Sequence, residues 1–323
     1  MGIEKILMLC FDKLKLLTST KNMKEFDKSK FQSVVLNEKI QYYRHIQKMP
    51  YYLEIRIDFE KDELVIEFTS KILETKFMEL INKETIYECL CAIPFVEFED
   101  DVEFLLGDFE VLKCDVTKDV SYGYAIKRLE RYVKSNLKNY DKWKCESHRN
   151  GFVLKNVAAT PKYKKRIVIY HKGRELKLEK NRAFVDTFDN LDDGSFFDEY
   201  FRDKVRFEMN INTKMQIREL LGIQDNNLLS VLNSDANPLF AVLNEAVTEQ
   251  GVNPHPVNSI KDYHCALVLK DCNNDLGQVE AKIRSLTSKN TSITRMMKPY
   301  RDYHSRILRD DSDRAFDLRK LLE

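Results

Sequence analysis

The chain has little glycine. It holds 9 glycines in 323 residues, about 3% against a usual content of roughly 7%. No two of them stand close enough to form a G-x-G-x-x-G fingerprint, and no G-x-x-x-x-G-K-[ST] loop occurs. Such loops need glycine because the backbone amides must approach a phosphate closely. The sequence therefore excludes the glycine-loop nucleotide-binding folds.

Cysteine pairs and long apolar runs are also missing. The seven cysteines are scattered and form no C-x-x-C pair, which excludes a zinc knuckle and favours reduced thiols over a disulfide framework. No apolar run approaches the ~18 residues of a membrane span. The short run 6–11 is followed at once by Asp12 and Lys13, unlike a signal peptide. We expect a soluble cytoplasmic protein without a membrane partner.

The charge is balanced overall and strongly biased locally. Lys and Arg number 53 against 52 Asp and Glu, yet residues 121–182 carry 18 Lys/Arg against 5 Asp/Glu, interleaved with aromatic residues. This mixture suits single-stranded nucleic acid, whose phosphates bind cations and whose bases stack on rings. A solvated basic helix face over core aromatics gives the same composition. Acidic stretches at 87–120 and 186–203 flank the segment, as expected if some carboxylates hold a metal against phosphate.

The periodicity of apolar residues predicts an α+β fold. Alternation indicates strands and a 3.6-residue period indicates helices. The predicted strands are 53–59, 63–69, 109–117, 165–172 and 204–211, and the predicted helices are 70–81, 124–137 and 213–221. Because helices lie between and after the strands, we expect a central antiparallel sheet with flanking helices. The prolines at 254 and 256 predict a boundary between a domain 1–253 and a small helical domain 254–323.

Polar residues stand opposite the apolar face of four predicted strands. Glu67, Asp115 and Glu208 are hard oxygen ligands of the kind that Mg²⁺ or Mn²⁺ prefers, and such an ion polarises a phosphodiester. Tyr170 is a poor nucleophile at its ordinary pKa of about 10, but a nearby metal or the ammonium of Lys172 would favour its phenolate. An antiparallel sheet with one face in water produces the same alternation without any chemistry.

Four segments carrying these residues resemble one family. Residues 166–176 (RIVIYHKGREL) resemble the strand with the nicking tyrosine in rolling-circle replication initiators, and 112–119 (LKCDVTKD) resemble their R-[IL]-D-x-x-x-D strand. Residues 65–73 (VIEFTSKIL) resemble their V-E-[FI]-x-x-[SN]-x-x-x-L segment, and 205–211 (VRFEMNI) their [LV]-R-[FV]-E strand. The blocks occur in the family's order across residues 60–222. The chain departs from the pattern in having Lys113 for the family's arginine and in lacking any H-x-H.

The family comprises Rep_trans-type plasmid initiators and the gene II endonuclease of filamentous phages, related to the HUH superfamily. The resemblance implies an HUH-like fold and a nick that leaves the 5′ phosphate on Tyr170, beside Lys172, and a free 3′-OH. It implies that Glu67, Asp115, Glu208 and Asp119 bind Mg²⁺ or Mn²⁺. The implied partners are single-stranded origin DNA, a host helicase and a second copy of the chain, in the cytosol of a bacterium carrying the plasmid or phage.

The DNA-binding surface is predicted from the basic segment and its surroundings. Its candidate side chains are Lys113, Arg128, Arg131, Lys162, Lys164, Lys165, Arg166 and Arg174, and Tyr163 and Tyr124 are alternative nucleophiles. Two other functions remain open. One is a metal-dependent nuclease in which water attacks, and the other is a non-catalytic origin- or operator-binding protein. Residues 257–323 carry 13 Lys/Arg against 10 Asp/Glu, which suits specificity, dimerisation or helicase contact better than bulk phosphate binding.

Overall fold

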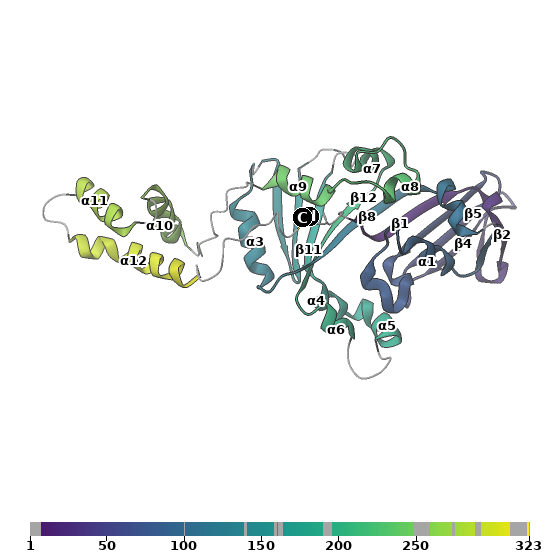
Figure 1. The fold of residues 1–323 in the computed structure, drawn as a ribbon, viewed down its shortest axis with the longest axis horizontal. Helices are drawn as coiled ribbons and strands as arrows, with labels where there is room; N and C mark the ends of the chain where they lie inside the picture. The colour runs from purple at the N-terminus through teal and green to yellow at the C-terminus, as the bar shows by residue number, and fades with distance from the viewer. Residues whose placement is uncertain are drawn as a thin grey trace, which may run out of the picture.

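The predicted α+β architecture is confirmed (Figure 1). In the computed structural model, the described residues are 8–99, 101–138, 141–157, 160, 164–189, 196–247, 257, 259–272, 275–287, 292–310 and 322. They contain a ten-stranded antiparallel sheet, helices on its two faces and a helical C-terminal region.

The strands of the large sheet follow the order β3-β4-β5-β6-β1-β8-β12-β11-β10-β9, and each pair of neighbours is antiparallel. The strands are β1 Phe11–Thr18, β3 Gln32–Leu36, β4 Lys39–Gln47, β5 Leu53–Asp58, β6 Glu63–Thr69, β8 Glu110–Ser121, β9 Trp143–His148, β10 Gly151–Asn156, β11 Arg166–His171 and β12 Lys204–Ile211. A separate small sheet pairs β2 (Met23–Phe26) with β7 (Val96–Phe98). The order places the N-terminal strand β1 at the centre of the sheet, between β6 and β8.

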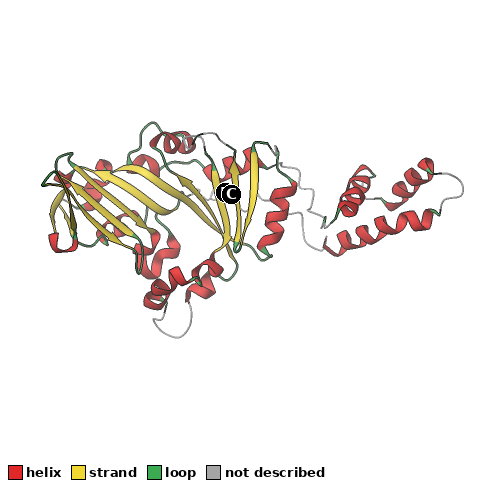
Figure 2. Cartoon of the chain, turned by 180° about the vertical axis from the view of Figure 1, so that it is seen from behind, coloured by secondary structure: helices red, strands yellow, loops and turns green. Residues whose placement is uncertain are grey.

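Helices cover the two faces of the sheet unequally. The main core combines the apolar face with α1 Ile86–Cys91, α2 Val102–Leu105, α3 Ile126–Ser135, α7 Lys214–Leu221, α8 Leu228–Leu232 and α9 Pro238–Ala246. The polar face meets α4 Lys172–Leu176, α5 Glu179–Phe188 and α6 Phe196–Tyr200, which pack around Phe77 in a cluster of their own. Figures 1 and 2 show α7–α9 and α4–α6 on opposite sides of the strands. Much of the polar face is therefore not covered by the described helices.

The predicted helix 70–81 is a 3₁₀ helix, η3 (Ser70–Glu79), broken by non-helical backbone at Glu74. Three further 3₁₀ turns are η1 Thr20–Asn22, η2 Lys28–Lys30 and η4 Leu106–Asp108. The hydroxyl of Ser70, the first residue of η3, donates to Asp12 at 2.9 Å. The predicted end of α7 is confirmed, since Gly222 follows it in the left-handed region at φ 65°.

The C-terminal helices have a core of their own. Helices α10 (Ile260–Asp271), α11 (Leu276–Leu286) and α12 (Ile293–Asp310) pack together around Leu269, Val279 and Met297. The predicted boundary at 253/254 lies outside the described residues. Leu322 is instead buried in the main core, where its carbonyl accepts hydrogen bonds from Lys118 and Asn237. None of the helices in the described part has the length and apolar character needed to cross a membrane.

Candidate active site

Strand pairing gathers the four segments that resemble the initiators on adjacent or nearly adjacent strands. The order β6-β1-β8-β12-β11 contains all four, with only β1 inserted among them. Asn210 lies opposite Asp115 across β12 and β8. Arg206 lies opposite Tyr170 on one side and Asp119 on the other. Because opposed residues point to the same face, these polar side chains share the face that α7–α9 leave uncovered.

Tyr170 is hydrogen-bonded to an acid. Its hydroxyl donates to Glu208 Oε2 at 2.9 Å. The register opposes Glu208 to Val168, so this contact is diagonal and relies on the length of the tyrosine. Burial raises the pKa of Tyr170 well above its usual value, and Glu208 adds to the rise while Arg206 opposes it. At neutral pH the hydroxyl is therefore protonated, with a carboxylate beside it to accept the proton.

Asp115 and Glu208 make no ion pair within the described residues. Asn210 lies between them, donating to Glu208 Oε1 at 3.4 Å and hydrogen-bonding to the Asp115 side chain. Burial raises the pKa of Asp115 to about 7, and the charges of Glu208 and Asp12 add to the effect. Burial, followed by Asp12, likewise raises the pKa of Glu208. Lys13 acts on Asp115, and Arg206 and Lys172 act on Glu208, only as nearby charges. Two carboxylates with raised pKa values and no ion pair among the described residues are suited to binding a cation.

Asp115 and Glu208 together suit an ion such as Mg²⁺, which leaves several of its coordination positions to water and substrate. No group of three or more His, Cys, Asp or Glu residues within the described ranges could hold a metal. Mg²⁺, however, is commonly held by one or two carboxylates together with substrate phosphates. Asp115 and Glu208 supply two such carboxylates, whereas the side-chain oxygen of Asn210 already accepts a hydrogen bond from Arg166 Nη1 at 3.3 Å.

Two of the four predicted metal ligands are already paired with cations. The Glu67 carboxylate forms ion pairs with Lys13 and with Lys15, the latter at 2.9 Å. Asp119 binds Arg206 through both carboxylate oxygens, at 2.7 and 2.6 Å. A divalent ion would have to displace these partners, so the assignment of Glu67 and Asp119 as metal ligands is corrected.

Asp12 belongs to the site and was not predicted from the sequence. It accepts hydrogen bonds from Ser70 and from the buried Arg206, the latter at 2.6 Å. A register shift between Phe11 and Lys13 interrupts the pairing of β1 with β8 at this residue. A bulge turns a side chain away from the simple alternation. The one feature of the sequence that could have indicated Asp12 is its position as a single acidic residue within an apolar run.

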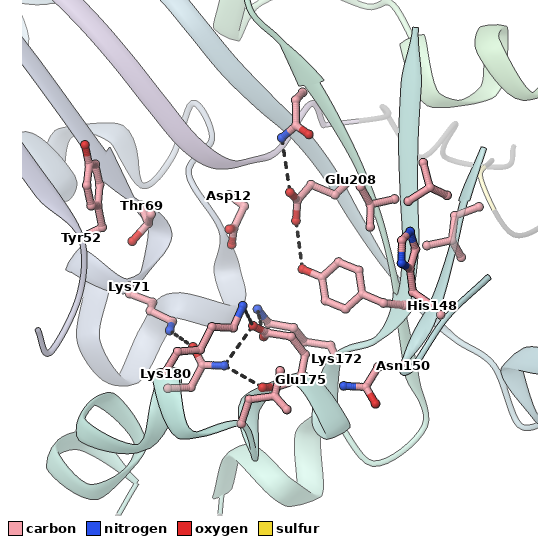
Figure 3. Close-up of a pocket in the computed structure, with 18 of the residues that line it drawn as sticks. Asp12, Tyr52, Thr69, Lys71, His148, Asn150, Lys172, Glu175, Lys180 and Glu208 are labelled. Carbon is pink, nitrogen blue, oxygen red and sulfur yellow. Dashed lines mark hydrogen bonds and ion pairs between the residues drawn. The ribbon is translucent and has the colours of Figure 1, made fainter. Parts of the chain in front are cut away.

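Tyr170 and Glu208 line a cavity of about 750 Å³ (Figure 3). The cavity has more cations than acids. Its basic lining residues are Lys48, Lys71, Arg149, Arg166, Lys172 and Lys180, and its acids are Asp12, Glu175 and Glu208. A hollow of about 280 Å³, lined by Lys113 and Asp115, shares Asn210 with it. An open, cation-rich cavity beside a tyrosine suits a phosphodiester chain.

Lys172 lies near Tyr170, although not on the same strand. β11 ends at His171, and Lys172 begins α4 with its side chain buried. Its Nζ is 5.9 Å from the centroid of the Tyr170 ring and 3.0 Å from Glu175 Oε2. The predicted strand 165–172 is thus one residue too long at each end. The ion pair with Glu175 also means that Lys172 is not an isolated positive charge beside the phenol.

The predicted DNA-binding residues are divided between the two faces. Arg166 lines the cavity, Lys113 lines the hollow, and Lys164 and Arg174 are exposed elsewhere. Lys162 and the alternative nucleophile Tyr163 lie outside the described residues. The cavity cations that sequence analysis missed are Lys48, Lys71, Arg149 and Lys180.

Three of the predicted DNA contacts belong to the helical side of the sheet. Arg128 and Arg131 are on α3, which packs into the main core against the apolar face. Lys165 is paired with Glu245 of α9 at 2.7 Å. Tyr124 lies 4.6 Å under the Arg128 guanidinium and does not line the cavity. These three cations therefore do not line the cavity that contains Tyr170.

A comparison of the chain with protein-family models and with curated proteins found no match.

Proposed function

We propose that this protein is a metal-dependent endonuclease and strand transferase that nicks and rejoins single-stranded DNA through Tyr170. The observation that carries the proposal is the Tyr170–Glu208 hydrogen bond, set in a cation-lined cavity next to the hollow that Asp115 lines. The adjacent placement of the four initiator-like segments adds support. Within this proposal the biological role is initiation at a rolling-circle origin in a bacterial cytosol, with a host helicase as partner.

The chemistry of the proposed nick follows from the hydrogen bond. Glu208 Oε2 accepts the hydroxyl proton as Tyr170 Oη attacks phosphorus. The Oη–P bond forms, the P–O3′ bond breaks, and the leaving 3′ oxygen takes a proton from water. The reverse attack by a 3′-OH releases Tyr170 and rejoins the strand. Burial raises the pKa of Glu208, so this carboxylate is a stronger base than an ordinary glutamate when no metal is bound to it.

Asp115 and Glu208 would hold the Mg²⁺ or Mn²⁺ ion of this site. When bound, the ion would polarise the phosphodiester as a Lewis acid. The residues of the chain would then orient the strand, because the cavity cations lie on several elements around Tyr170.

A covalent-trapping assay tests the proposal. The full chain is incubated with Mn²⁺ and a pool of 3′-labelled single-stranded DNA, and the products are run on a denaturing gel. We expect an EDTA-sensitive band at the mass of protein plus DNA, with the attachment mapped to Tyr170 by mass spectrometry. Metal-dependent cutting without an adduct would instead identify a water-using nuclease. Binding without cutting would identify a non-catalytic DNA-binding protein.

A further inference from the structure

One wall of the cavity holds a lysine without an anion. Glu175 forms ion pairs with Lys172 at 3.0 Å and with Lys180 at 2.7 Å. Lys71 has no ion pair within the described residues, and its Nζ donates to the neutral side chain of Asn181 at 2.7 Å. The Phe184 ring lies 4.8 Å from the same ammonium. The ammonium groups of Lys71, Lys172 and Lys180 thus lie around the Glu175 carboxylate, and Lys71 is the one that forms no ion pair with it.

The surroundings of Lys71 penalise its charge. Burial lowers its pKa to about 8, and the positive charges of Lys172 and Lys180 lower it further, whereas the carboxylates of Glu175 and Asp12 raise it only in part. A half-buried ammonium in this position is stabilised by any anion that enters the cavity. The cluster is therefore built to receive negative charge rather than to pair within the protein.

A hydrogen-bond donor without a partner stands beside this lysine. The Thr69 hydroxyl oxygen is buried, and no partner for it is found in the described part of the chain. Thr69 and Lys71 both line the cavity. Figure 3 shows them on the same side, with Lys172, Glu175 and Lys180 along the base and Glu208 across from them. A hydroxyl and an ammonium with unused capacity form a donor pair for phosphate oxygens.

We propose that Lys71 and Thr69 form a second phosphate subsite, which holds a DNA phosphate next to the one attacked by Tyr170. The acidic pair Asp115 and Glu208 is the place for a metal and the scissile phosphate, whereas Lys71 offers charge of the opposite sign. Lys172, 5.9 Å from the Tyr170 ring, joins the two regions. This inference rests on the proposed function, since it takes the ligand to be single-stranded DNA.

The test measures DNA binding without the reaction, in the full chain carrying Tyr170→Phe and without metal. Single methylphosphonate linkages neutralise one phosphate of the oligonucleotide at a time. We expect Lys71→Met to weaken binding about tenfold at low salt and to reduce the salt slope by roughly one. At one position, the neutral linkage should weaken DNA binding by the parent protein by a similar factor. The same linkage should not weaken DNA binding by Lys71→Met any further. Thr69→Val should show a smaller loss at that same linkage.

The matched control is Lys76→Met, because Lys76 is exposed and pairs with Glu88 outside the cavity. Lys71→Arg should retain most of the affinity, which separates lost charge from misfolding. The subsite is overturned if Lys71→Met binds DNA like the parent, or if it remains as sensitive as the parent to every linkage. One combination of results would overturn DNA as the ligand. In that case inorganic phosphate raises the Tm of the parent but not of Lys71→Met, while the two proteins bind DNA equally well. If DNA affinity falls at one linkage but the trapping assay gives no covalent adduct, the subsite is supported and the nicking reaction is rejected.

Discussion

Arg206 and Asp119 face each other across β12 and β8 and form a two-pronged ion pair, with Nε and Nη2 donating to the two carboxylate oxygens at 2.7 and 2.6 Å. The third donor, Nη1, reaches Asp12 at 2.6 Å. Arg206 is 0% exposed and lies opposite Tyr170 in the register. The guanidinium therefore ties the central strands β1, β8 and β12 together beside the tyrosine.

Removing this guanidinium should destabilise the fold strongly. Arg206→Met removes the ion-pair partner of the buried Asp119 carboxylate and one of the partners of Asp12, and breaking a buried pair in this way costs about 3–5 kcal/mol. Urea denaturation at pH 7 measures the loss. Adding Asp119→Asn should recover part of it, whereas Arg202→Met on the exposed surface should change stability by no more than about 0.5 kcal/mol. An Arg206→Met protein as stable as the parent would contradict the role given to this network.

Tyr170→Phe should abolish the covalent adduct and the nick while leaving DNA affinity within about twofold. The substitution removes the attacking oxygen and leaves the ring in place. Gel-shift titration and the trapping assay give the two measurements. Tyr124→Phe is the matched control, because Tyr124 lies away from the cavity, and it should react normally. An adduct formed by Tyr170→Phe would move the nucleophile to another tyrosine.

Mn²⁺ should raise the Tm of the protein, and more at pH 8 than at pH 6. The pKa of Asp115 is raised to about 7, so protons occupy the carboxylate at pH 6 and compete with the ion. Above pH 7 the carboxylate is ionised and the competition ends. Asp115→Asn should remove most of the Mn²⁺-induced shift at both pH values, whereas Glu219→Gln on the exposed face of α7 should keep it. Equal shifts in Asp115→Asn and the parent would exclude this residue as a ligand.

Much of the polar face could be predicted because its strands alternate cleanly. Asp115, Tyr170 and Glu208 stand on strands with regular apolar partners, and they converge as expected. The bulge at Asp12 breaks the period of two, so sequence periodicity could not assign that residue to the site. The edge strand β3 and its neighbour β4 are exposed or half-buried along their whole length, which removes the alternation that would have revealed them.

The cations of the cavity could not be predicted from local sequence. Lys48 and Arg149 come from connections between strands, and Lys180 comes from α5, so only the tertiary fold brings them together. The basic segment 121–182 was interpreted as one surface. Its strands and α3 in fact distribute its charges to both faces of the sheet, because successive strand residues point in opposite directions.

A chain that ends before residue 257 should remain folded and should still form the adduct with a short single-stranded oligonucleotide. Helices α10–α12 pack around a core of their own, and none of their described side chains belongs to the main core. The truncation does remove Leu322, whose burial in the main core suggests a loss of about 2–5 kcal/mol. Leu322→Ala in the full chain is the matched comparison, and urea denaturation should show a similar loss of sheet stability in both. Loss of discrimination for double-stranded origin DNA, or of an oligomeric state seen by light scattering, should appear only in the truncated chain. If the truncated chain is insoluble or cannot cleave, while Leu322→Ala remains active, the three helices complete the catalytic domain.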